Sequence, residues 1–334
     1  MAISHPFESA AEERMTSITA RDHAGLLERL QILRANIESV FIGKTEAITQ
    51  LLVGLFARGH VLIEDVPGVG KTVLAKAVAK SIDCSFSRVQ MTPDLLPSDI
   101  LGVSVYNEKT GAFVFKHGPI FANIVLADEI NRTTPRSQSA LLEVMDEAQV
   151  SVEGKAVAIE RPFMVIATQN PFEFEGTYFL PENQLDRFIL RIRIGYPSRE
   201  DERQILREQP DRTVLESLQP VMGAKEVQAI QAVVDQVRVD DALMDYLQDV
   251  VEATRRHDAI EVGVSPRGAL ALLRAARSSA LLNGRDYTIP DDFKQLARPV
   301  FAHRIVTKSY LREGHTASSD QILLEILESV TAPN

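Results

Sequence analysis

Short apolar runs alternate with amphipathic stretches through the first part of the chain. The apolar runs predict β-strands at 60–64, 85–89, 124–129, 163–168 and 188–194. Between them, apolar residues recur at helical spacing and predict helices at 23–40, after Gly43, at 71–81 and at 136–148. Strands that alternate with helices favour a mostly parallel sheet with helices on both faces. The pattern therefore predicts an α/β fold here.

Two stretches interrupt this alternation and predict β-hairpins. One covers 100–118, where two alternating runs flank residues 107–111. The other covers 149–160 and turns at Gly154, because glycine supplies the positive φ that such turns need. Phe113 and Phe115 lie at strand period two in the first hairpin, so they share a face. Packing of this face against the protein is the favoured interpretation, and contact of these rings and Tyr106 with a substrate protein is the alternative.

The strand pattern stops beyond residue 197, and the remainder has a helical period. Helices are predicted at 199–208, 224–236, 240–256, 266–283, 290–303 and 320–331. Residues 1–22 are polar and predict a flexible segment. We therefore expect an α/β domain at 23–197 and a helical domain at 198–334.

Composition narrows the classes of protein further. The chain has 45% apolar and 25% charged residues, as in ordinary soluble proteins, and a formal net charge of −10. An acidic chain is a poor candidate for general binding to nucleic acid, although a local basic stripe remains compatible with it. Cys84 is the single cysteine and the histidines are scattered, which argues against disulfides and a zinc site. The start of the chain lacks the features of a leader, and no apolar run is long enough to span a membrane, so we expect a cytoplasmic protein.

A glycine-rich loop follows the strand at 60–64 and predicts a nucleotide site. Residues 61–72 read VLIEDVPGVGKT, which differs from the usual phosphate-loop pattern only in having Asp65 at the first glycine. Glycines allow backbone N–H groups to contact phosphate oxygens, Lys71 reaches the β- and γ-phosphates, and the Thr72 hydroxyl is a ligand for Mg²⁺. The predicted nucleotide-binding residues here are Val66, Pro67, Gly68, Val69, Gly70, Lys71, Thr72 and Val73.

Adjacent acids at the end of another strand add the chemistry of hydrolysis. Asp128 is expected to hold Mg²⁺ and Glu129 to act as general base on the attacking water. Acids after a strand can instead cap a helix, but the phosphate loop favours the catalytic interpretation. Asn170 follows the strand at 163–168 and is expected to contact the γ-phosphate or the water; its alternative is a turn residue before Pro171. ATP and Mg²⁺ are the expected cofactors.

Four segments resemble the MoxR family of AAA+ ATPases. They read DLLPSDILG at 94–102, FKHGPIFANIVLADEINRTTPRSQSALLEVMDE at 115–147, ATQNP at 167–171 and LPENQLDRF at 180–188. The likeness extends from about residue 25 to 310. It implies a P-loop NTPase (AAA+) sheet domain, with the 100–118 hairpin inserted in its second helix, followed by a small all-helical lid. It also implies a homo-oligomeric ring, usually a hexamer, with chaperone-like action on proteins that often carry a von Willebrand A-type domain.

The resemblance assigns further site residues. Arg187 resembles an arginine finger that reaches the neighbouring subunit's γ-phosphate, and a surface salt bridge is its alternative. Arg267 resembles the sensor 2 residue, with which the lid contacts the same nucleotide as the phosphate loop; its alternative is a solvated arginine. Phe41, Ile42 and Gly43 resemble the segment that flanks adenine, against an ordinary packing corner between helices.

Other functions share this architecture. A nucleic-acid motor would need a basic stripe or an aromatic stacking platform, which the net charge disfavours. The motor subunit of a metal chelatase shares the two hairpins, and an ATP-regulated adaptor would differ only in turnover. A MoxR-type ATPase that remodels or assembles partner proteins is the leading hypothesis, with no binding to nucleic acid or membrane expected.

Overall fold

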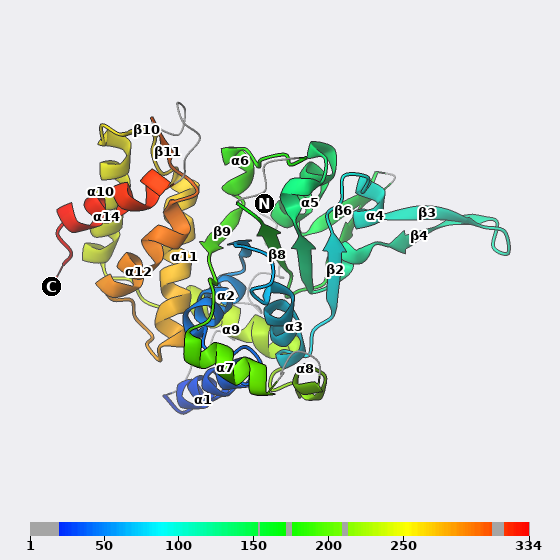
Figure 1. The fold of residues 1–334 in the computed structure, drawn as a ribbon, viewed down its shortest axis with the longest axis horizontal. Helices are drawn as coiled ribbons and strands as arrows, with labels where there is room; N and C mark the ends of the chain where they lie inside the picture. The colour runs from blue at the N-terminus through cyan, green and yellow to red at the C-terminus, as the bar shows by residue number, and fades with distance from the viewer. Residues whose placement is uncertain (1–19, 153, 172–175, 209–212, 309–316, 334) are drawn as a thin grey trace, which may run out of the picture.

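A five-stranded parallel sheet forms the centre of the molecule (Figure 1). The computed structural model describes residues 20–152, 154–171, 176–208, 213–308 and 317–333. The strands are β1 (His60–Glu64), β2 (Phe86–Gln90), β5 (Ile124–Asp128), β8 (Met164–Gln169) and β9 (Phe188–Ile192). Their order across the sheet is β2-β5-β8-β1-β9, and each neighbouring pair is parallel. This order puts the carboxyl ends of β5, β8 and β1 side by side.

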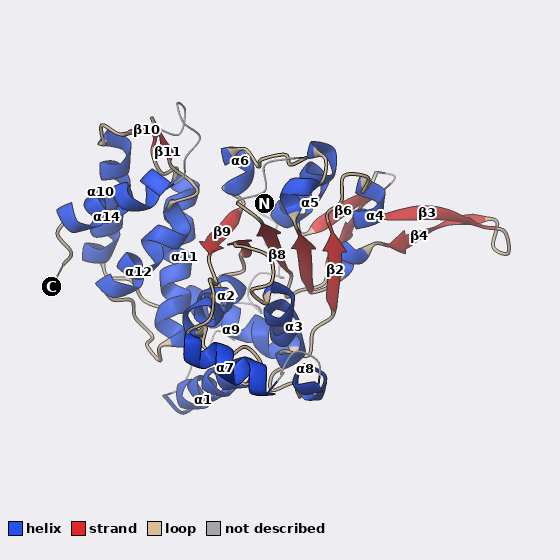
Figure 2. Ribbon diagram, viewed as in Figure 1, coloured by secondary structure: helices blue, strands red, loops and turns tan. Residues whose placement is uncertain are grey.

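Helices cover both faces of the sheet, as the sequence pattern predicts (Figure 2). One face packs on α1 (Ala20–Glu38), α2 (Thr45–Phe56) and α3 (Lys71–Ser81), and the other on α4 (Pro97–Leu101) and α5 (Pro135–Glu147). Successive strand residues belong to different cores: Val61 and Ile63 pack on the first face and Leu62 on the second. Because both faces are covered, the inner strands β5 and β8 are mainly apolar rather than alternating.

Both predicted hairpins are present. β3 (Gly102–Asn107) pairs with β4 (Ala112–His117) and projects from the body of the protein, while β6 (Gln149–Val152) pairs with β7 (Lys155–Ala158) (Figure 1). The favoured packing interpretation for the aromatic face is wrong at Phe113, which is 67% exposed and forms an edge contact with Tyr106. Phe115 lies nearer the base of the hairpin, where it packs on Phe121, so the body of the protein covers only that end.

The C-terminal part consists of helices. They are α7 (Arg199–Glu208), α8 (Thr213–Ser217), α9 (Ala224–Gln236), α10 (Asp241–Arg256), α11 (Pro266–Leu282), α12 (Pro290–Phe301) and α14 (Ala317–Ser329), whereas α6 (Glu182–Leu185) precedes β9. One short antiparallel pair, β10 (Ile260–Val262) with β11 (Val306–Thr307), departs from the expected all-helical lid. It is too short for a sequence pattern to reveal.

The helices after residue 197 form two groups in Figure 1. Helices α7, α8 and α9 lie beside α1–α3 beneath the sheet, whereas α10–α14 form a separate layer at one side. Gln231 on α9 donates to the carbonyl of Leu55 on α2 at 2.7 Å, which ties the first group to the sheet domain. The division at residue 197 stays a prediction. Residues 1–19 of the predicted flexible segment lie outside the described residues, and no described helix is long and apolar enough to cross a membrane.

Candidate nucleotide site and arginine cluster

The phosphate loop joins β1 to α3 and adopts conformations that its glycines allow. Gly68 and Gly70 both have a φ of +89°, in the region that favours glycine. A Cβ on Gly70 would lie 2.8 Å from Cε2 of Phe41, so a larger residue would displace this ring as well as strain the backbone. The loop therefore presents its backbone at the start of α3, where the helix dipole favours an anion.

Lys71 begins α3 and connects the loop to the acids. Its Nζ donates to the main-chain oxygen of Asp65. Burial lowers the pKa of Lys71 below 10.5, and the carboxylates of Asp65, Asp128 and Glu129 oppose this shift. The fold therefore brings the predicted phosphate-binding lysine close to both predicted catalytic acids. Thr72 follows in the first turn of the same helix.

Thr168 on β8 holds the two acids in place. Its hydroxyl donates to Oδ1 of Asp128 at 2.6 Å and accepts from the backbone N–H of Glu129 at 2.8 Å. Glu129 has a φ of +61°, an uncommon backbone for a non-glycine residue, which turns its side chain out of the strand direction. A single buried hydroxyl thus contacts the carboxylate of Asp128 and the backbone of Glu129.

Two side chains from β2 contact the acids, and Arg132 also pairs with Glu129 at 3.0 Å. Arg88 pairs with Oδ2 of Asp128 at 2.6 Å, and Gln90 donates to Oε2 of Glu129 at 2.8 Å. Sequence reasoning missed both residues and also Thr168. Their sequence signal was the presence of polar residues near the carboxyl ends of the strands that neighbour β5. A parallel sheet brings such residues next to the acids that follow β5.

The remaining predicted residues come from the same edge of the sheet. Asn170 directly follows β8, between the ends of β5 and β1 in the sheet order, and is half-buried. A hydroxyl from Thr72 and a carboxylate from Asp128 are the hard oxygen donors that Mg²⁺ prefers. This donor set would fit a magnesium ion.

An apolar cleft of about 570 Å³ adjoins the phosphate loop. Its lining includes six of the predicted nucleotide-binding residues, namely Phe41, Ile42, Gly68, Val69, Gly70 and Val73. Gly43 is not among the lining residues of the cleft. It packs instead on Asp201 of α7, and a Cβ added to Gly43 would lie 2.3 Å from Cγ of Asp201. The lining also includes residues that were not predicted, namely Gly195, Tyr196, Pro197, Glu202, Ile205 and Leu206. An apolar lining suits a planar base.

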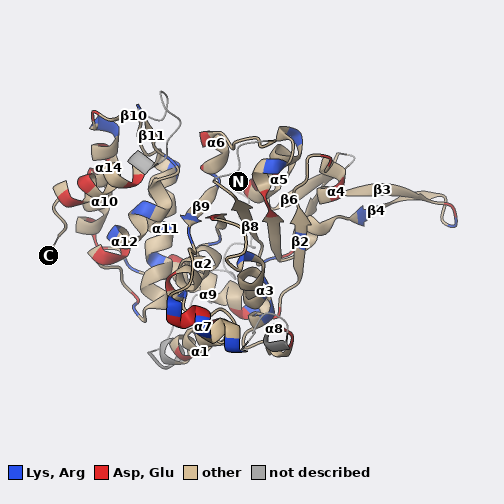
Figure 3. Ribbon diagram, viewed as in Figure 1, with Lys and Arg blue, Asp and Glu red and all other residues tan. Residues whose placement is uncertain are grey.

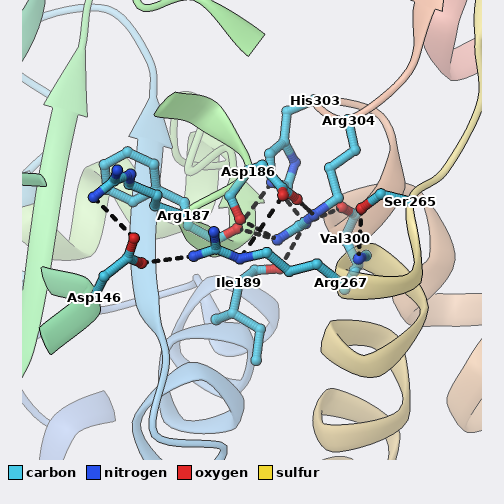
Figure 4. A network of polar contacts seen from close by, with 11 residues as sticks. Asp146, Asp186, Arg187, Ile189, Ser265, Arg267, Val300, His303 and Arg304 are labelled. Carbon is cyan, nitrogen blue, oxygen red and sulfur yellow. Dashed lines mark hydrogen bonds and ion pairs between the residues drawn. The ribbon is translucent and has the colours of Figure 1, made fainter. Parts of the chain in front are cut away.

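A second polar cluster surrounds Arg187 (Figure 4). Asp146, at the end of α5, pairs with Arg187 at 2.8 Å and with Arg267 at 2.6 Å. Asp186 pairs with Arg304 at 2.7 Å and lies 3.8 Å from Arg267. We call Asp146, Asp186, Arg187, Arg267 and Arg304 the arginine cluster. It joins α5 and the start of β9 to the C-terminal helices.

Arg304 is the buried member of the arginine cluster. Its guanidinium also donates to the main-chain oxygens of Asp186 and Phe188, at 3.1 and 2.6 Å. Burial lowers the pKa of Arg304 to about 10, while the Asp186 carboxylate opposes the shift. Arg304 therefore fastens the C-terminal helices to the segment that carries Arg187.

The arginine cluster and the phosphate loop lie at opposite ends of the sheet. Phe188, the residue after Arg187, pairs with His60 at the start of β1, whereas the loop follows Glu64 at its end. Four residue steps along a strand span about 13 Å. The expectation that Arg267 and the phosphate loop of one chain contact the same nucleotide is therefore wrong for this arrangement, because Arg267 lies beside Arg187 instead.

Comparison with known proteins agrees with this architecture. Residues 60–190 match the family described as ATPase family associated with various cellular activities (AAA), and residues 252–326 match the AAA lid domain. The chain is 49% identical to the uncharacterized protein YeaC of Bacillus subtilis, over 89% of this chain and 93% of that protein. A crystal structure from Cytophaga hutchinsonii, described as an ATPase, superposes with a TM-score of 0.85 at 36% identity, covering 93% of this chain and 97% of the other.

A named relative narrows the family. Chaperone MoxR1 of Mycobacterium tuberculosis is 39% identical, over 89% of this chain and 80% of that protein. The similarity thus extends well beyond the nucleotide-binding residues and includes the C-terminal helices. With the phosphate loop, the paired acids and a helical lid in one chain, this protein belongs to the MoxR family of AAA+ ATPases.

Proposed function

We propose that this ATPase hydrolyses ATP with Mg²⁺ as a subunit of a ring, usually a hexamer in this family, and uses the energy to remodel or assemble partner proteins. The chaperone name of the relative from Mycobacterium tuberculosis supports the second part. The arrangement of the acids around Lys71 supports the first. A protein with a von Willebrand A-type domain is the favoured partner.

The catalytic roles follow from the positions of the side chains. Lys71 and the loop N–H groups hold the phosphates, and Thr72 and Asp128 would hold Mg²⁺. When bound, this ion neutralises charge on the phosphate oxygens. Glu129 takes a proton from the attacking water, and Asn170 orients that water or contacts the γ-phosphate. Phe41 and Ile42 line the cleft for the base.

The separation of the arginine cluster from the phosphate loop carries the proposal of a ring. Arg187 lies at the amino end of the sheet and the loop at its carboxyl end. No lining residue of the nucleotide cleft also lines the 180 Å³ pocket around Arg187 and Arg267. A guanidinium that stabilises the transition state must touch the phosphate. Arg187 therefore acts on the nucleotide of a neighbouring subunit, as does Arg267 beside it.

Mixed rings test this assignment. An Arg187→Ala subunit keeps an intact phosphate loop, and a Lys71→Ala subunit keeps an intact Arg187. Arg187→Ala alone should lose about 10³-fold in turnover, the usual contribution of such an arginine, and Lys71→Ala alone should also turn over poorly because it lacks the phosphate-binding lysine. Mixing the two should restore hydrolysis, because one kind of interface is then complete. Turnover is measured against the fraction of mixed rings determined by native mass spectrometry.

The outcome separates action in trans from action within one chain. If mixed rings form and hydrolysis stays at the level of the single variants, Arg187 does not serve a neighbour. A turnover number that is independent of protein concentration through the range where the ring dissociates would contradict the ring itself. Restored hydrolysis together with a rise in turnover on assembly supports both.

The exposed hairpin supports proteins as the partners. Tyr106 and Phe113 are 54% and 67% exposed near its tip, and Figure 3 shows strands β3 and β4 mainly without charge. Its bases are Lys109 and Lys116. Exposed aromatic rings with few charges are typical of protein interfaces, whereas a phosphate backbone needs several bases.

A further inference from the structure

Asp65 occupies the first position of the phosphate loop, where the usual pattern has glycine. Its side chain is buried, with 8% of the residue exposed. A buried carboxylate is costly unless hydrogen bonds satisfy its oxygens. The contacts of Asp65 therefore indicate why this loop carries an acid.

The carboxylate of Asp65 binds the chain where β9 ends. Oδ2 accepts from the backbone N–H groups of Ile194 and Gly195 at 2.7 and 2.6 Å, and Oδ1 accepts from Val66 at 2.8 Å. Hydrogen bonds to an ionised acceptor are stronger than neutral ones. Lys71 bonds the main-chain oxygen of Asp65 rather than its carboxylate, so a residue without the side chain could keep that contact.

The segment held by Asp65 forms one wall of the nucleotide cleft. Gly195, Tyr196 and Pro197 all line it, as does Phe41. Two further contacts fix the same segment: Lys44 donates to the carbonyl of Tyr196 at 2.6 Å, and Glu64 pairs with Arg193 at 3.1 Å. The phosphate loop and the apolar wall are thereby joined through consecutive acids at the end of β1.

We propose that Asp65 is a positioning residue that builds the nucleoside side of the cleft by holding the 193–197 segment against the phosphate loop. The proposal rests on the ATP site described above and assigns the binding of the polyphosphate and of the nucleoside to different residues. The loop glycines and Lys71 bind the polyphosphate, and Asp65 secures the wall against which the base and sugar pack. Loss of its carboxylate should weaken the nucleoside contribution to affinity and leave the polyphosphate contribution intact.

Two substitutions and two probes test whether Asp65 acts on nucleoside binding alone. Asp65→Gly restores the usual loop pattern and removes both acceptor oxygens, while Asp65→Asn keeps the shape and one acceptor oxygen. The probes are ADP and inorganic tripolyphosphate, which has no base or sugar, both measured by calorimetry. Asp249→Asn, at an exposed carboxylate on α10, controls for the loss of one negative charge. Thermal unfolding of each variant confirms that it is folded.

We expect Asp65→Gly to weaken ADP about tenfold, comparable to the loss of one or two charge-assisted hydrogen bonds. Its affinity for tripolyphosphate should stay the same or rise, because a negative charge near the phosphates is gone. The KM for ATP should rise by a similar factor with kcat changed by less than about twofold. Asp65→Asn should lose less ADP affinity than Asp65→Gly, because its amide oxygen can still accept from the N–H groups of Ile194 and Gly195.

Gly195→Ala offers an independent route to the same segment. Gly195 has a φ of +67° and an added Cβ would meet only Nζ of Lys44, at 3.8 Å, so alanine strains the wall without a clash. It should weaken ADP and spare tripolyphosphate, as Asp65→Gly does. Equal losses for both probes, or no loss for either, would overturn the role of Asp65. Competition between ADP and tripolyphosphate on the wild-type chain tests the ATP site separately, so a failure there is distinguishable.

Discussion

Arg187 and Arg267 are ion-paired to the same carboxylate. Oδ2 of Asp146 lies 2.8 Å from Nη1 of Arg187, and Oδ1 lies 2.6 Å from Nη2 of Arg267. Arg187 comes from the sheet domain and Arg267 from the first turn of α11. A shared carboxylate keeps the two guanidinium groups together, so we expect both to act on one phosphate group of a neighbouring subunit.

Replacement of Arg267 tests this pairing. Arg267→Ala should leave ATP affinity within about threefold of wild type, because its own phosphate loop is remote, and should lower turnover about 10²-fold. Mixing it with Lys71→Ala should restore part of the turnover. Arg256→Ala is the control, since Arg256 is a largely exposed arginine of α10. Loss of ATP affinity without restoration on mixing would place Arg267 at the nucleotide of its own chain.

The loop lysine and the catalytic acid should separate binding from turnover. Lys71→Ala should weaken ATP about 100-fold, because a charge-assisted contact to the ground-state phosphates is lost. Glu129→Gln should bind ATP normally and stop turnover, since Glu129 acts on the water. Lys76→Ala, at an exposed lysine of the same helix, should change neither. A Glu129→Gln chain that hydrolyses at the wild-type rate would remove Glu129 from the catalytic role.

Thr168 provides a test of how the acids are positioned. Thr168→Val keeps the shape of the side chain but leaves Asp128 and the Glu129 N–H without this hydroxyl. We expect turnover to fall about 10- to 100-fold with a smaller change in ATP affinity. Thr168→Ser retains the hydroxyl and should recover most of the turnover. Equal turnover in the valine and wild-type chains would show that the acids do not depend on Thr168.

Local sequence signals predicted the helices and strands well where several agreed. The predicted bounds of α3 and α9 match the structure, and those of β1 do also. At α3, the phosphate loop fixes the start, and helical spacing carries the pattern to Ser81. The phosphate loop and the helical spacing involve residues that are close in sequence. One amino-acid sequence is therefore enough to recognise them.

Contacts between distant segments could not be predicted. The pairing of Asp146 with Arg267 depends on how α11 docks on α5, and no local pattern encodes that distance. The lining of the nucleotide cleft by Tyr196 was missed because no local pattern shows that the residues after β9 return to the phosphate loop. At Phe113, alternation established which side chains share a face but not what covers that face.

Stability should fall in mild acid because of His60. Nε2 of His60 donates to the carbonyl of Met145 at 2.8 Å and Nδ1 accepts from the N–H of Val165 at 2.9 Å, which requires the neutral ring. Burial lowers the pKa of His60 from 6.5 to about 4. Between these values the unfolded chain binds the proton and the folded chain does not, so stability is complete above pH 6.5 and decreases as the pH falls toward 4.

Urea unfolding at two pH values measures this effect. The free energy of unfolding should be about 2 kcal/mol lower at pH 5 than at pH 7 from His60 alone. His60→Gln can donate and accept without titrating, so its decrease should be smaller. Burial also lowers the pKa of His303 well below 6.5, and some decrease should remain in the variant. Identical decreases in wild type and His60→Gln would contradict the assignment.

The exposed tip of the first hairpin should determine which proteins the ring retains. Glu129→Gln with ATP should hold its partner in a stable complex, because hydrolysis no longer releases it. Adding Phe113→Ser should reduce the retained partner at least about tenfold, as for an aromatic anchor, while basal turnover of the single Phe113→Ser variant stays unchanged. Val262→Ser, at an apolar residue of β10 that is 53% exposed, is the matched control.

The same complex distinguishes a protein remodeller from a nucleic-acid motor. A protein with a von Willebrand A-type domain is the first partner to test, added in purified form to the Glu129→Gln ring. DNA and RNA should leave turnover unchanged at physiological salt, because the tip presents Tyr106 and Phe113 with few bases. Strong, salt-sensitive stimulation by nucleic acid, with no protein held by the trapped ring, would contradict the remodelling function and support a motor on nucleic acid instead.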